Sequence, residues 1–183
     1  MHFMRLIWRA TFILNIGENM DNPELSPNTI MLGERNYEAA LDTVIALAEN
    51  ELLIFDQDFE RGNYASQQGF ELLFEFLNKD NLSKLTIILQ NTEHFIQHCP
   101  RLFGLLKNYG HKMVVYETND AAKVAKDCFV IADKQHYVRR FHIDQARFKY
   151  VLNDAEECAN LGMRFDELLD ETTEAVSATK LGL

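Results

Sequence analysis

Hydrophobic and polar residues alternate along this chain in a way that predicts strands and helices in turn. Continuous apolar runs at 51–55, 84–90 and 112–117 are too short for helices and are typical of strands buried on both faces. Residues 34–49, before the first run, carry apolar side chains three and four positions apart. Residues 66–78, between the first and second runs, show the same spacing. These two segments are predicted to be amphipathic helices. Helices of crossover length between buried strands favour parallel, right-handed connections.

The pattern changes after residue 124. Residues 127–133 and 137–141 have the alternation, aromatic content and charged turn of a β-hairpin. One more strand is expected at 146–152, followed by a helix that begins near Asp154. Together, the elements predict an α/β fold: a mixed β-sheet with a parallel βαβαβα core, a C-terminal β-meander plus helix, and helices on both faces.

The composition divides the chain into three parts. Residues 1–28 are expected to be a partly disordered N-terminal extension, because Met20 opens a polar segment that would make a natural amino terminus. The apolar start is similar to a signal peptide, but Arg9 interrupts it and no small-residue cleavage site follows. We expect one domain at 29–172 and a flexible tail, rich in Thr, Ser and Ala, at 173–183.

Charge and cysteine usage narrow the range of partners. The 28 acidic residues outnumber the 18 basic ones, and a net charge of −10 disfavours binding to a phosphate backbone. The pair Arg139–Arg140 is typical of a solvated surface. The three cysteines are odd in number and far apart, which is typical of buried free thiols in the cytoplasm. Since no apolar run reaches the ~18 residues of a membrane span, no membrane contact is expected.

The hairpin, 126–142, has the sequence KDCFVIADKQHYVRRFH. Coming after alternating strands and helices, it resembles the core of the phospholipase D-like family, and the resemblance to one half of such a protein covers about residues 32–170. In that family this strand carries the motif HxKxxxxD, followed by a Gly-Ser pair and then an Asn. Two such histidines act as a pair, one attacking phosphorus and the other protonating the leaving group.

The resemblance implies a degenerate motif in this chain. With Asp133 on the motif aspartate, Lys126 stands at the nucleophilic histidine and Cys128 at the phosphate-binding lysine. Arg140 and Phe141 replace the Gly-Ser pair. A lysine at the nucleophile position is almost fully protonated unless it is buried. The resemblance therefore implies that the chemistry of the family is lost.

Candidate binding residues remain at the carboxyl ends of the parallel strands and around the hairpin, where a cleft would gather ligands. The candidates for binding an anion or docking a partner are Asp56, Asp58, Asn91, Lys126, Asp133, Arg139 and Arg140. We expect no catalytic residue and no cofactor. His94 and His98 have the i, i+4 spacing of zinc ligands, but a third ligand is not evident, and no metal site is expected.

The leading hypothesis is a non-catalytic phospholipase D-like domain that acts as a binding, regulatory or protein-interaction module. Because one half makes only half of a family site, the expected partner is a second copy (a homodimer) or another protein domain. Nucleic acid is disfavoured. Domains of this kind occur alone in proteobacteria or beside acetyltransferase domains, which favours an accessory role. The alternatives are a phosphodiesterase or phosphatidyl-transfer enzyme with a rearranged active site, and a binder of a small anionic ligand.

Overall fold

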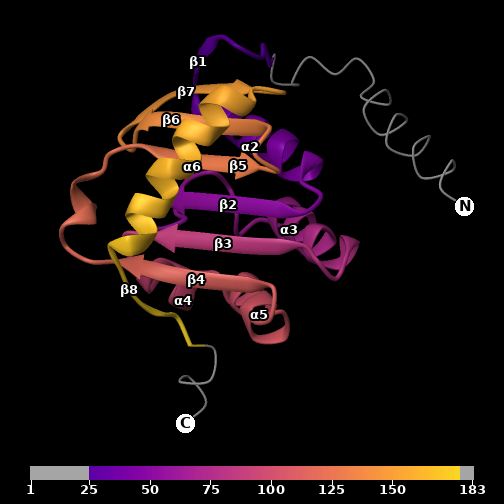
Figure 1. Cartoon of the computed structure of the whole chain (residues 1–183), viewed down its shortest axis with the longest axis vertical. Coiled ribbons are helices and arrows are strands. Elements are labelled where there is room, and N and C mark those ends of the chain that lie inside the picture. Colours follow the sequence, from indigo (N-terminus) through magenta and orange to yellow (C-terminus); the bar gives the residue numbers. More distant parts are fainter. Residues whose placement is uncertain (1–24, 178–183) are drawn as a thin grey trace, which may run out of the picture.

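The computed structural model of the chain describes residues 25–177, and all elements below lie in that range. Helices and strands alternate at first, and a run of strands and a long helix follow (Figure 1). In chain order, the elements are β1 (Ile30–Leu32), α2 (Glu34–Leu47), β2 (Glu51–Asp56), α3 (Gln67–Lys79), β3 (Lys84–Leu89), α4 (Glu93–His98), α5 (Pro100–Asn108), β4 (Met113–Thr118), the 3₁₀ turn η1 (Ala122–Val124), β5 (Cys128–Ala132), β6 (His136–His142), β7 (Gln145–Val151), α6 (Ala155–Asp170) and β8 (Thr172–Ala175).

The three apolar runs form the parallel centre of one mixed sheet. β2 pairs with β3 and β3 with β4, both in parallel register. The middle of each strand is inaccessible to solvent, as Ile54, Ile88 and Val115 are each 0% exposed. Strands that are covered on both faces cannot show a polar face, which explains why these runs are continuously apolar. The expected parallel core is confirmed.

The predicted meander follows. β5 lies antiparallel to β2, and β5, β6 and β7 then pair in antiparallel order. The β5–β6 turn has Asp133 and Lys134 at positive φ, 52° and 56°, a backbone conformation that matches the twist of a tight hairpin. β1 closes one edge against β7, so the full order is β1-β7-β6-β5-β2-β3-β4-β8.

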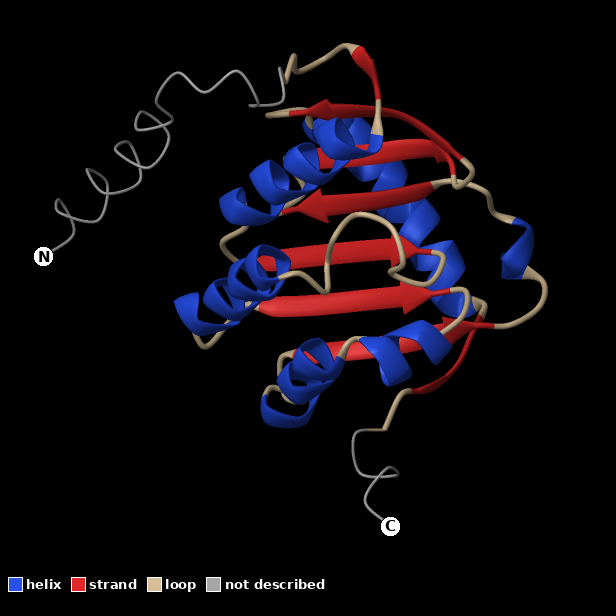
Figure 2. Ribbon diagram, turned by 180° about the vertical axis from the view of Figure 1, so that it is seen from behind, coloured by secondary structure: helices blue, strands red, loops and turns tan. Residues whose placement is uncertain are grey.

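Helices cover both faces of the sheet. Figure 2 shows α2, α3, α4 and α5 on one side, while Figure 1 shows α6 running obliquely across the other. Side chains alternate between the two faces, so Ile54 of β2 joins the core under α2, and Phe55 joins the core under α6. Within residues 25–177, no helix combines the length and apolar content that crossing a membrane requires.

The tail differs from the sequence prediction at its start. Residues 172–175 form β8, which pairs antiparallel with β4 and closes the second edge of the sheet. Residues 173–175 were expected to belong to a flexible tail and are instead part of β8, because backbone pairing with an open strand edge needs no apolar side chains. Residues 178–183 and 1–24, including Met20 and Arg9, lie outside the described range.

Asp133 holds the hairpin turn to the start of β2. Its carboxylate accepts hydrogen bonds from the backbone N–H groups of Glu49 (2.7 Å), Asn50 (2.8 Å) and Glu51 (2.8 Å). Replacing Asp133 by alanine should lower the free energy of unfolding by about 1–2 kcal/mol, as for the loss of a helix cap. The variant Asp133→Asn, which tolerates positive φ and keeps an acceptor, should lose less in the same urea titration. Equal losses in the two variants would contradict this role for the carboxylate.

Candidate functional site

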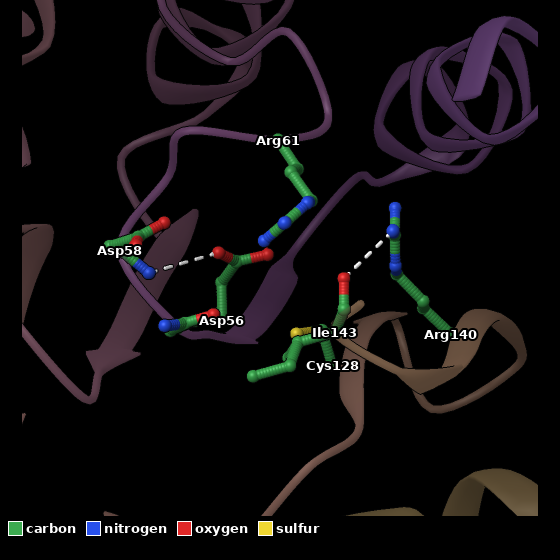
Figure 3. Close-up of a pocket in the computed structure, with 7 residues that line it drawn as sticks. Asp56, Asp58, Arg61, Cys128, Arg140 and Ile143 are labelled. Atoms are coloured by element: carbon green, nitrogen blue, oxygen red, sulfur yellow. Dashed lines mark hydrogen bonds between the residues drawn. The ribbon is translucent and has the colours of Figure 1, made fainter. Parts of the chain in front are cut away.

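A small cavity with several charged residues in its lining lies at the carboxyl end of β2, where the sequence predicted a binding site. Figure 3 shows the charged side chains that surround it. Its volume is about 10 Å³, roughly the room one water molecule needs. The residues that line it are Asp56, Gln57, Asp58, Arg61, Cys128, Arg140 and Ile143.

Asp56 is the last residue of β2 and is only 3% exposed. Its carboxylate accepts hydrogen bonds from the backbone N–H groups of Phe59 (3.0 Å) and Asp58 (3.2 Å), and so fixes the turn that follows the strand. Burial raises the pKa of Asp56 to about 6, against the opposing effect of these two hydrogen bonds. Asp56 therefore holds its proton over part of the pH range in which an exposed aspartate is ionised.

Most hydrogen-bond donors of Arg140 are occupied by groups of the same chain. It is 1% exposed, and its guanidinium makes two hydrogen bonds to Glu34, at 2.6 and 2.8 Å. It also donates to the backbone carbonyls of His142 (3.1 Å) and Ile143 (2.8 Å), and its guanidinium carbon lies 5.1 Å from the centre of the Tyr37 ring. The hydrogen bonds from Arg140 lower the pKa of Glu34. Because these contacts use most of its N–H donors, Arg140 forms a structural ion pair with Glu34 and has few donors left for an external anion.

Three side chains near Asp56 and Arg140 are buried and neutral: Cys128, Tyr37 and Tyr64. Burial, with the charge of Asp56 nearby, raises the pKa of the Cys128 thiol well above its usual value. Burial also raises the pKa of Tyr37 and of Tyr64, whose ring stacks on Phe59 at a centroid distance of 4.2 Å. Neither phenol oxygen makes a hydrogen bond of normal geometry to the described part of the chain, although the Tyr37 hydroxyl lies near enough to raise the pKa of Tyr64 further.

This arrangement has few of the groups that phosphoryl transfer requires. A neutral thiol is a weak nucleophile, and no histidine of residues 25–177 lines the cavity. The two histidines of the hairpin region have backbone contacts instead: Nδ1 of His136 accepts the N–H of Asn153, and Nδ1 of His142 accepts that of Asp144. The cluster has the composition of a buried polar network that stabilises one conformation.

The structure brings three of the predicted site residues together and separates the others. Asp56, Asp58 and Arg140 line the cavity. Asn91 lies at the end of β3, where its side chain accepts the N–H of Glu93 at the start of α4. Its backbone N–H donates to the carbonyl of Gln57 at 2.9 Å, so Asn91 is beside the cavity without lining it.

Three further predicted residues lie outside the cavity. Lys126 is exposed, and its carbonyl accepts the N–H of Ile143 at 2.7 Å. Cys128 is the first residue of β5, and Asp133 follows the last one, so the length of the strand separates Asp133 from the cavity. Arg139 lies on the α6 face, where it pairs with Asp127 at 3.1 Å. The expectation of one solvated pair at 139–140 is wrong, since neighbouring residues of a strand point to opposite faces.

Several residues in and around the Asp56 cavity were not predicted from the sequence. Glu34, Tyr37 and Tyr64 lie around it, and Arg61 lines its rim. Glu34 and Arg140 are 106 positions apart, so no local spacing signals their pairing. One signal was available for Arg140: once β6 is known to pair with two strands, one arginine of an adjacent pair must face the core and needs an acid.

The fold is that of phospholipase D family members. The chain aligns with Nuc, a phospholipase D family member from Salmonella typhimurium, at a TM-score of 0.61 and 9% identity, over 81% of this chain and 99% of that one. It aligns with NucT from Helicobacter pylori at 0.52 and 14% identity, over 79% and 96%. TrmBL2, an archaeal chromatin protein with a novel mode of DNA binding, gives 0.61 and 12% identity, over 93% of this chain. The chain spans 61% of the length of TrmBL2.

Residues 34–180 match a family described as a domain of unknown function, DUF7931. The match covers most of the sequence, and the chain belongs to this family. No curated protein matches the sequence.

These comparisons correct one expectation about partners. The prediction that nucleic acid is disfavoured is contradicted, because a protein described by its DNA binding shares the fold over nearly the whole chain. The earlier inference used the net charge of −10, which is a sum over the molecule. Contact with phosphate groups depends instead on the local arrangement of cations, which a total charge does not describe.

Proposed function

We propose that this chain is a non-catalytic phospholipase D-like domain that acts by binding another molecule. The observation that supports this most is the state of Arg140, which is buried and holds Glu34 with two hydrogen bonds. By its resemblance to the phospholipase D-like family, the chain has Arg140 at a position where that family has the Gly-Ser pair after its HxKxxxxD motif. A large, ion-paired side chain there fills space that a substrate phosphate would need.

The motif positions support the same proposal. The family resemblance places Cys128 at the phosphate-binding lysine, and here that side chain is a buried thiol without a positive charge. Lys126, at the nucleophile position, is exposed. A nucleophile has to be held against the phosphorus that it attacks, and a side chain that projects into solvent is not held in this way. We take the functional unit to be the domain predicted at 29–172, extended by β8.

The relatives widen the range of molecules that the domain is proposed to bind. TrmBL2 is described as a DNA-binding chromatin protein, so nucleic acid belongs among the ligands to test, beside protein partners and small anions. The main alternative to a binding role is a phosphodiesterase that uses substitute residues. Asp56 and Cys128 are each only 3% exposed, so neither offers such an enzyme an exposed nucleophile.

Turnover assays separate these two functions. The purified chain should hydrolyse neither bis(para-nitrophenyl) phosphate, nor phosphatidylcholine vesicles, nor DNA above the rate of buffer alone. The variants Lys126→Ala and His142→Ala serve as controls, because both residues are exposed or partly exposed and should leave the thermal melt unchanged. Turnover that disappears in either variant while the melt is unchanged would overturn the non-catalytic proposal.

A further inference from the structure

A second concave region lies on the α6 face of the sheet, away from the Asp56 cavity. It has a volume of about 320 Å³, within the size range of ligand sites. We call it the β6–β7 groove, and it is lined by Tyr137, Arg139, Phe141, Lys149, Asp154 and Glu157. In Figure 1, α6 begins over β6 and β7 and then crosses the sheet obliquely towards β4 and β8. Part of β6 and β7 is therefore not covered by this helix.

Phe141, which lines the groove, has two guanidinium groups near its ring: that of Arg139, which also lines the groove, and that of Arg147 on β7. The guanidinium carbon of Arg147 lies 5.6 Å from the centre of the Phe141 ring, and that of Arg139 lies 6.0 Å from it. Phe141 is partly exposed. A partly exposed ring with cations nearby offers a stacking surface to a flat, electron-rich group that carries negative charge.

The cations differ in how much of their charge is already used. Arg139 pairs with Asp127 at 3.1 Å and with Glu157 at 3.8 Å. Arg147 and Lys149 make no ion pair within residues 25–177. They alternate along β7, so both point to the α6 face with Phe148 pointing the other way. Two unpaired cations on one strand face would suit successive phosphates of a bound strand.

The edge strand extends this surface with apolar side chains. β1 pairs with β7 so that Ile30 is opposite Lys149 and Leu32 is opposite Arg147. Residues directly opposite in a sheet share a face, and these two are unusually exposed, at 53% and 66%. Large apolar side chains beside unpaired cations give a surface that can contact both bases and phosphates.

The opposite wall of the groove is acidic. Asp154 caps α6 by accepting the N–H of Glu157, and Glu157 faces Arg139. Burial raises the pKa of Tyr137, which also lines the groove, to about 12, and the negative charges of Glu157 and Asp154 contribute to this rise. A bound phosphate would be repelled from this wall and would lie on the β7–β1 side, next to Arg147 and Lys149.

We infer that the β6–β7 groove and the adjoining β1 edge bind single-stranded nucleic acid, with a base on Phe141 and phosphates at Arg147 and Lys149. This goes beyond the proposed loss of catalysis and does not depend on it, because no residue of the Asp56 cavity takes part. A duplex hides its base faces, so a stacking ring that is partly exposed favours single strands. With two phosphate contacts, affinity should fall about sevenfold between 50 and 200 mM salt.

Fluorescence anisotropy with a labelled oligothymidine tests the inference on the full chain. We expect binding with a dissociation constant in the micromolar range at low salt. Phe141→Leu keeps apolar bulk and removes the π face, and should weaken binding about 5- to 150-fold. Arg147→Ala should weaken binding and also reduce its salt dependence.

Matched variants on the other side of the sheet are the controls. Phe74→Ala removes a 42% exposed ring of α3, and Lys107→Ala removes an exposed cation of α5. Neither should change the affinity. The inference is overturned if the oligonucleotide does not bind at low salt, if Phe141→Leu binds as tightly as the unmodified chain, or if the control variants lose as much. Equal binding of a duplex, or equal competition by inorganic polyphosphate, would also overturn it. All of these readouts are independent of turnover.

Discussion

Replacing Arg140 by alanine should lower the free energy of unfolding by about 3–5 kcal/mol. The substitution deletes the two hydrogen bonds to Glu34 and removes the donors that satisfy the carbonyls of His142 and Ile143. It also leaves a void beside Tyr37, because a large, fully buried side chain is lost. Urea unfolding followed by circular dichroism measures the change.

Two further variants show whether burial is the cause. Arg147→Ala, an exposed arginine on the next strand, should change stability by less than about 0.5 kcal/mol. The loss of unfolding free energy in Glu34→Gln should lie between those of Arg140→Ala and Arg147→Ala. The Glu34 side chain is 49% exposed, so water can partly replace its carboxylate. A loss below about 1 kcal/mol in Arg140→Ala would contradict a buried structural role for this residue.

The second large effect is a dependence of stability on pH that comes from Asp56. Its pKa rises from 3.8 to about 6 on folding. Below about pH 3.8 the carboxyl is protonated in both states and costs nothing. As the pH rises towards 6, the unfolded chain releases the proton first, so folding becomes less favourable by about 3 kcal/mol in total. Above pH 6 this penalty is fully present.

The variant Asp56→Asn should remove that dependence. An asparagine carbonyl can still accept the N–H groups of Phe59 and Asp58, while the penalty for a buried negative charge disappears. The variant should match the unmodified chain near pH 4 and exceed its stability at pH 7, by up to about 3 kcal/mol less the cost of burying the amide N–H groups. Urea titrations across this range measure both curves.

Asp42 is the control for this pH effect. Burial also raises its pKa to about 6, but this side chain is only partly buried, and the effect of Asp42→Asn should be in the same direction and smaller. If Asp56→Asn kept the full pH dependence of the unmodified chain, the carboxylate of Asp56 would not be its source.

The elements of the fold were largely predictable from the sequence, because their signals are local. Continuous apolar runs mark strands that are covered on both faces, and Ile54, Ile88 and Val115 lie in such strands. The hairpin at 127–141 was visible from its alternation and turn. β8 was not predictable, because a Thr-rich segment carries no apolar pattern and is ordered by pairing with β4.

The candidate site was less predictable, because burial and long-range pairing decide it. Asp56 and Asp58 follow a buried strand, and their position at its carboxyl end could be inferred. Whether Arg139 or Arg140 faced the core depended on the register of β6 with its neighbours, which the sequence leaves open. The partner of Arg140 depended on where Glu34 falls in three dimensions.

The most direct test of a closed, non-catalytic centre is the reactivity of Cys128 in the folded protein. The protein is treated with iodoacetamide at neutral pH, and each cysteine peptide is followed by mass spectrometry. Cys99, Cys128 and Cys158 are all buried free thiols, so none should be modified in buffer and all three should be modified in urea. Modification of Cys128 at the rate of an exposed thiol, while the circular dichroism spectrum stays native, would contradict the closed centre.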